Sequence, residues 1–142
     1  MFRKRFFASW MFSAITMLLL FYIWHGIIIF DFDGLSYNKR QFMLVASLVY
    51  VLIGFLVTKA FNISYFVNKY KKKAITRGFR AGASIGFLLF LISTICDFPF
   101  HSEFNFRHLF FDSLWQMLEQ GLGGIVVALT HIFIFEPEMI DD

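Results

Sequence analysis

The chain has 142 residues, of which 58% are hydrophobic and 16% are charged, and its mean hydropathy is +0.66. Globular domains average roughly 45–50% apolar and about 25% charged residues, so this composition excludes an ordinary soluble domain. The net charge of +3 would suit a nucleic-acid partner, but the basic residues flank apolar stretches, where they set membrane topology, and we expect no such partner. The single cysteine, Cys96, excludes an intrachain disulfide.

The first half of the chain holds two apolar stretches, each long enough for the roughly 20-residue helix that crosses a bilayer. The first covers about residues 6–30, follows a basic triplet at residues 3–5 and contains His25. Its apolar part is too long for a secretory signal peptide, so we predict a retained signal anchor. The second covers about residues 41–60 and ends beside Lys59, whose long side chain can reach the head groups.

The second half holds two more such stretches. The third, about residues 75–96, is the shortest, and it reaches the required length only if Arg77 and Arg80 extend toward the head groups. The fourth covers about residues 109–135 and contains three ionisable residues, Asp112, Glu119 and His131. The sequence therefore predicts an all-α membrane protein, an antiparallel bundle of four transmembrane helices in a single domain.

The basic residues alternate between the two sides of these stretches. Three precede the first, two separate the first from the second, seven lie within residues 59–80, and one precedes the fourth. The positive-inside rule then predicts that both termini lie in the cytoplasm. We expect residues 59–80 to contact anionic lipid head groups. The abundance of Phe, Ile, Lys and Asn suggests an AT-rich bacterial genome and hence a bacterial inner membrane.

Small residues line one face of the third stretch at four-residue spacing, which stacks them on one side of a helix. They are Gly78, Gly82, Gly86 and, further along, Ser93. The fourth stretch repeats the theme with Gly123 and Gly124. Such faces let two helix backbones approach closely in lipid. The pattern favours packing inside the bundle, with an interface to a second copy or to another membrane protein as the alternative.

The fourth stretch also carries a polar stripe at about 100° per residue, formed by Asp112, Gln116 and Glu119. A charge at the bilayer centre costs roughly 2.5–3.5 kcal/mol on insertion scales, so such residues are usually paired or functional. His25 would lie at a depth comparable to that of Glu119. The sequence favours a structural contact of Glu119. The alternatives are proton or ion handling by Glu119 and His25, with Asp112 and Gln116 nearby, or a shallow, solvated carboxylate.

Weak candidates for a metal site lie between the third and fourth stretches. Asp97 with His101, and His108 with Asp112, have the i, i+4 spacing that places two side chains on one helical face. Imidazole and carboxylate together suit zinc, iron or manganese. However, Pro99 would break the helix of the first pair, and no cysteine or tight ligand motif supports the site. We therefore expect no cofactor.

The sequence contains no phosphate-binding loop, nucleophile elbow or zinc-protease motif that would identify an enzyme class. Three functions therefore remain open. The leading hypothesis is a non-catalytic inner-membrane protein that acts through helix packing, as a homo-oligomer or as a subunit of a larger complex. The alternative is a small proton- or ion-coupled transporter or channel that uses Glu119 and His25. The third is a metal-dependent membrane enzyme.

Overall fold

The computed structural model describes residues 2–34, 36, 38–97 and 105–135, and all regular structure in these ranges is helical. By length and composition, four helices can span a membrane, and they are Lys4–Ile28, Lys39–Phe61, Ala74–Cys96 and Phe106–Ile134. Each lies within a few residues of a predicted stretch. The prediction of an all-α protein with four helices long and apolar enough to span a membrane is confirmed.

The spans are built from helices α1 (Phe2–Phe21), α2 (Lys39–Phe61), α4 (Ala74–Asp97) and α5 (Phe106–Thr130), with a short helix α3 (Ser64–Lys69) after α2. The helices α1 and α5 continue as π-helical segments, Tyr22–Ile28 and His131–Phe135. Nothing in the apolar pattern predicts this change of helix type. Because π-helical turns widen a helix locally and are frequent at functional sites, the segment after α1 is a candidate part of a functional site.

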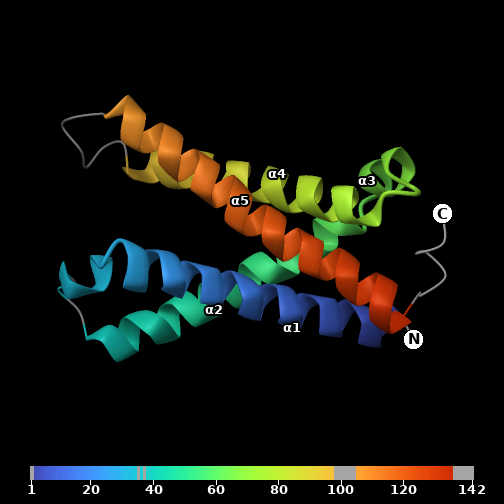
Figure 1. The fold of residues 1–142 in the computed structure, drawn as a ribbon, viewed down its shortest axis with the longest axis horizontal. Helices are drawn as coiled ribbons and strands as arrows, with labels where there is room; N and C mark the ends of the chain where they lie inside the picture. The colour runs from blue at the N-terminus through green and yellow to red at the C-terminus, as the bar shows by residue number, and fades with distance from the viewer. Residues whose placement is uncertain (1, 35, 37, 98–104, 136–142) are drawn as a thin grey trace.

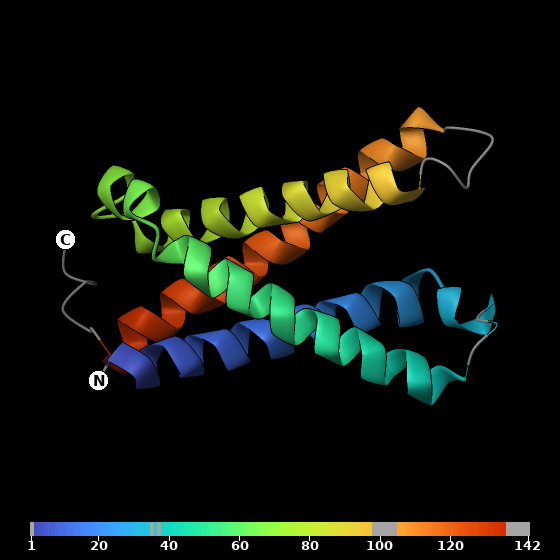
Figure 2. The ribbon, with the colours of Figure 1, turned by 180° about the vertical axis from the view of Figure 1, so that it is seen from behind.

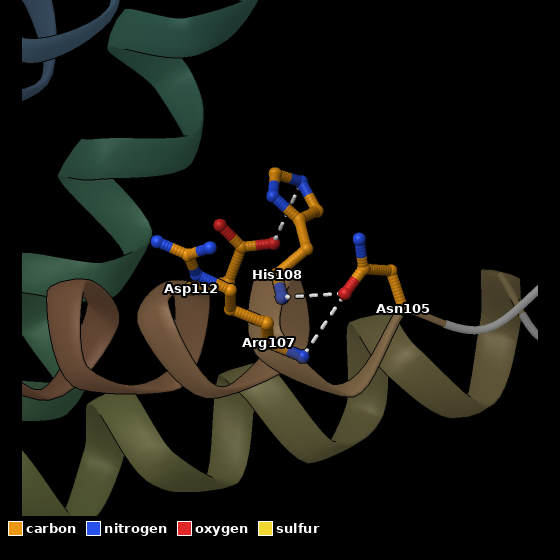
Figure 3. Close-up of polar contacts among 4 residues, drawn as sticks. All are labelled: Asn105, Arg107, His108 and Asp112. Atoms are coloured by element: carbon orange, nitrogen blue, oxygen red, sulfur yellow. Dashed lines mark hydrogen bonds and ion pairs between the residues drawn. The ribbon is translucent and has the colours of Figure 1, made fainter.

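Two asparagines fix where spans begin. The side-chain oxygen of Asn38 accepts a hydrogen bond from the backbone N–H of Arg40 at 3.0 Å, which caps α2. Asn105 caps α5 in the same way through the N–H groups of Arg107 and His108, at 3.1 and 3.4 Å (Figure 3). These bonds satisfy backbone donors that have no partner inside a helix.

The helices associate as two pairs, α1 with α2 and α4 with α5 (Figure 1). The same pairs are seen from behind (Figure 2). Helix α5 joins the pairs, because it packs against α1 as well as α4. In an 18-residue window of its span 56% of the residues are buried, compared with 22–28% in the other three spans. The helix that carries the polar stripe is therefore the central one.

The glycine face of α4 packs directly on the backbone of α5. A Cβ atom added at each of these glycines would collide with a carbonyl group of α5, and the facing pairs are Gly78 with Gly124, Gly82 with Gln120 and Gly86 with Gln116. Residue numbers rise along α4 as they fall along α5. Ser93 lies outside this contact, because it is exposed and its hydroxyl donates to the Phe90 carbonyl of its own helix at 3.0 Å.

A neighbouring face of α5 meets α1 through Gly123. A Cβ atom at Gly123 would lie 2.5 Å from the sulfur of Met17, which is fully buried. The buried hydroxyl of Ser13 donates a hydrogen bond to the Gly123 carbonyl oxygen at 3.0 Å. The glycines of α5 thus face different neighbours, since Gly124 meets α4 and Gly123 meets α1.

We expect Ser13→Ala to lower the free energy of unfolding by about 1 kcal/mol, because it leaves a buried carbonyl without its interhelical partner. The matched control is Thr16→Ala, since the Thr16 hydroxyl is bonded to the Phe12 carbonyl of its own helix on the exposed side. Equilibrium unfolding in mixed micelles would measure both. Equal losses in the two variants would show that the bond to α5 adds nothing.

Candidate functional site

Glu119 is the least exposed ionisable residue in the described part of the chain. It is 1% exposed and lies 13 residues after Phe106 and 15 before Ile134, within one residue of the midpoint of the α5 span. A carboxyl group at such a depth is costly, so in membrane proteins it faces the bundle interior or an aqueous path. The adjacent Gln120 is fully buried. The polar stripe therefore reaches the centre of the bundle.

Three polar side chains surround the Glu119 carboxyl group. Gln120 donates a hydrogen bond from Nε2 to Glu119 Oε1 at a long 3.4 Å. The Tyr50 hydroxyl of α2 and the Trp115 indole also face the carboxyl group. Neither the Tyr50 hydroxyl nor the Trp115 indole makes a hydrogen bond to Glu119 Oε2. We call this set, Tyr50, Trp115, Glu119 and Gln120, the Glu119 cluster.

The Glu119 cluster contains buried polar atoms that make no hydrogen bond. They are Glu119 Oε2, Gln120 Oε1 and Trp115 Nε1, two acceptors and one donor. Buried polar groups in folded proteins are nearly always paired, so each exception calls for an explanation. The groups known to face the carboxyl group include no lysine or arginine. The unpaired atoms leave hydrogen-bonding capacity beside the Glu119 carboxyl group, which can itself hold a proton.

An aromatic stack joins the Glu119 cluster to the π-helical segment Tyr22–Ile28. The rings of Trp24 and Trp115 lie parallel, with centroids 4.0 Å apart and an interplanar angle of 12°. Gln116 is half-buried beside Trp115, and its carbonyl faces Gly86 of α4. The stack connects the end of the first span to the fourth span, one helical turn from Glu119.

His25 lies beyond this stack. Its ring packs on Phe21, with centroids 4.8 Å apart. Because Trp24 is opposite Trp115, the residue of the first span level with Glu119 is Leu20, and His25 is about five residues, or roughly 7.5 Å, further along the axis. Tyr50, rather than His25, supplies the nearby polar group from another helix. A functional pair of Glu119 and His25 stays a prediction.

Asp112 lies at the exposed end of the stripe, away from the Glu119 cluster. Its carboxylate is 3.4 Å from His108 Nε2, and the two side chains are 52% and 76% exposed (Figure 3). An exposed i, i+4 pair of this kind contributes little to stability. The structure thus assigns Asp112 a surface contact next to the start of α5.

The structure describes only some of the residues that were predicted as weak candidates for metal ligands. His101 lies outside the described residues, as does the side chain of Asp97. Within the described ranges, no group of three or more His, Cys, Asp or Glu residues is placed to hold a metal ion. His108 and Asp112 come together as a pair, without a third ligand among those residues.

Two features of the interior escaped the sequence reasoning. Tyr50 is 7% exposed and faces Glu119, and the signal available was one hydroxyl in a mostly apolar stretch that also contains Ser47 and Thr58. The second feature is a buried pair at the other end of α5, where Ser9 Oγ lies 3.1 Å from His131 Nδ1. His131 also approaches the Val127 carbonyl at 2.9 Å. This pair joins the start of α1 to the end of α5.

No protein-family model matches this chain, and no curated protein or solved structure is significantly similar to it.

Proposed function

We propose that this protein is a small proton- or ion-coupled transporter or channel in which Glu119 is the group that takes up and releases the proton or ion. One observation carries the proposal. A carboxyl group lies at the midpoint of a membrane span, almost fully buried, with one oxygen that makes no hydrogen bond. A residue retained for stability alone would be expected to have its hydrogen bonds satisfied.

The glycine face of α4 gives the competing function no separate support. Gly78, Gly82 and Gly86 are covered by α5 of the same chain, so they leave no small-residue seam open for a partner. Lipid solvates the large exposed apolar side chains as well as a protein partner would, so these side chains do not indicate a partner. A role in helix packing, as a homo-oligomer or as a subunit of a larger complex, stays a prediction.

We further propose an antiparallel bundle with both termini in the cytoplasm, in a bacterial inner membrane. The distribution of lysine and arginine supports this orientation. The contact of Ser9 with His131 supports the placement of both termini on one side, because it brings the beginning of the first span to the end of the fourth. The connection through α3, with its lysines, lies at the same end (Figure 1).

Cysteine labelling would test the orientation. In a Cys96→Ser background, a cysteine at Ser36 or Ser102 should react with a membrane-impermeant thiol reagent in intact cells, whereas one at Asn68 should react only after lysis. Ser36 and Asn68 are both exposed, so accessibility from the aqueous phase, not burial, decides the result. Labelling of the Asn68 variant in intact cells would contradict the proposed topology.

Flux into liposomes tests the function itself. Liposomes that contain the purified full chain and an internal pH-sensitive dye should equilibrate an imposed pH gradient faster than empty liposomes do. Gradients of K⁺ and Na⁺, applied in separate experiments, would identify a cation as the coupled species. If none of these gradients dissipates faster than in empty liposomes, the proposal fails. A stable oligomer or copurifying membrane protein would then favour the packing role.

A further inference from the structure

A hollow of about 450 Å³ is lined by residues of the segment that joins α3 to α4. Figure 1 shows that α3 lies at the end of the molecule where α1 starts. None of the residues that line the hollow belongs to the Glu119 cluster, and the site does not depend on the proposed transport function. Its charged lining is entirely basic, and together with one tyrosine it comprises Lys69, Tyr70, Lys71, Lys72, Lys73 and Arg80. We call it the basic hollow. Its lining contains no acidic side chain.

Two of these cations are held in place rather than left to move freely in solvent. The Arg80 guanidinium lies over the Tyr70 ring, 5.0 Å from its centroid, and Nη1 of Arg80 donates a hydrogen bond to the Tyr70 hydroxyl. Lys69 Nζ donates to the Tyr65 hydroxyl at 2.8 Å. This hydrogen bond raises the pKa of Lys69. Each of the two tyrosines thus holds one cationic side chain of the basic hollow.

Anions bind where such positioned donors converge. A phosphate group offers several oxygen acceptors, and arginine and lysine are the side chains that bind it best. The first turn of α4 adds the hydroxyl of Thr76 to the lining, one helical turn before Arg80. The chemistry of the basic hollow therefore fits a phosphate group.

The apolar surroundings indicate which molecule carries this phosphate. Ile75 and Phe79 precede Thr76 and Arg80 in the sequence, belong to the third membrane span and are 48% and 37% exposed. A molecule bound in the basic hollow would thus have exposed apolar side chains of a membrane span beside it. A soluble phosphate makes no use of such a surface, whereas the acyl chains of a lipid do.

We propose that the basic hollow is a binding site for the phosphate head group of one anionic phospholipid, with its acyl chains against Ile75 and Phe79. Lys69 and Arg80 contact the phosphate, and Tyr70 is a positioning residue that acts through Arg80. This goes beyond a general attraction of basic residues to a charged membrane surface, because it requires a defined geometry and a single bound lipid.

Lipid titration of the purified full chain in neutral detergent tests the site. Short-chain phosphatidylglycerol should bind with a stoichiometry of one and more tightly than short-chain phosphatidylcholine. Loss of a cation should weaken phosphatidylglycerol binding about fivefold, equivalent to about 1 kcal/mol, so the double variant Lys69→Gln with Arg80→Gln should lose roughly 25-fold. Tyr70→Phe keeps every charge and should still weaken binding, because Arg80 loses the hydroxyl that holds it.

The matched control is the double variant Lys4→Gln with Lys59→Gln. It removes the same charge from exposed lysines at the same end of the bundle but outside the basic hollow, and should bind phosphatidylglycerol as the wild type does. Circular dichroism would verify that all variants keep their helices. Equal losses in the control and in the Lys69/Arg80 variant, or no effect of Tyr70→Phe, would show diffuse attraction and overturn the site. Inorganic phosphate that binds as tightly as phosphatidylglycerol would overturn the lipid assignment.

Discussion

Replacement of Gly82 by leucine is expected to lower the free energy of unfolding by about 3 kcal/mol or more, at the upper end of the cost of overpacking. A Cβ atom at this position would lie 2.7 Å from the carbonyl carbon of Gln120 and 3.0 Å from the Cα atom of Gly121. These are backbone atoms of a helix, which cannot turn aside as a flexible side chain can. The two helices would have to separate, and the contacts along α4 and α5 would be lost.

Ser93→Leu is the matched control for this substitution. It places the same side chain on the same helix, at a position that the sequence also assigned to the small-residue face but that the structure leaves exposed. We expect its unfolding free energy to stay within about 0.5 kcal/mol of the wild type. Unfolding in mixed micelles, followed by circular dichroism, would measure both variants. Wild-type stability of Gly82→Leu would show that α4 and α5 do not pack through this face.

Replacement of Glu119 by glutamine is expected to reduce proton or cation flux in liposomes to the level of empty liposomes. The amide has the shape of the carboxyl group and can still interact with Tyr50, Trp115 and Gln120, but it can neither titrate nor carry a negative charge. We therefore expect helix content and stability to change little. Loss of flux without loss of fold is the outcome that separates a functional role of Glu119 from a structural one.

Asp112→Asn is the control for the loss of a carboxylate. It removes a charge from the same helix at an exposed position near its start, and should retain flux.

Tyr50→Phe should lower the flux only in part, because it removes one neighbour of the carboxyl group and leaves the titrating group in place. His25→Gln tests the predicted pairing with Glu119, and a loss that matches that of Glu119→Gln would support it. Wild-type flux in Glu119→Gln would exclude the carboxyl group as the carrier.

The glycine interface and the Glu119 cluster are physically connected. Gly82 faces the carbonyl of Gln120, and Gly86 faces the carbonyl of Gln116, so the close approach of α4 sets the position of α5 at the level of the cluster. Gly82→Leu is therefore expected to impair flux as well, through displacement of Gln120 rather than through any change in charge. Glu119→Gln should do the reverse and impair flux without affecting the interface.

The sequence by itself determined the four spans and their approximate limits. A membrane crossing depends on local properties, because every backbone group must be hydrogen-bonded within its own helix and about 20 apolar residues must follow one another. Both conditions can be read from one segment at a time. The spacing of Gly78, Gly82 and Gly86 likewise indicated a face for close approach, and the position of Glu119 within the fourth span marked it as unusual.

Only the tertiary structure decided which surfaces meet. It assigned α5 to the glycine face of α4, turned Tyr50 toward Glu119, stacked Trp24 on Trp115 and left Ser93 outside the contact. In a soluble protein the apolar side of a helix identifies the side that is buried. Here lipid and protein interior are both apolar, so the pattern along a span does not reveal how the helix is rotated or which residue of another span lies beside it. Those relations between distant residues are set by the packing of the helices on one another.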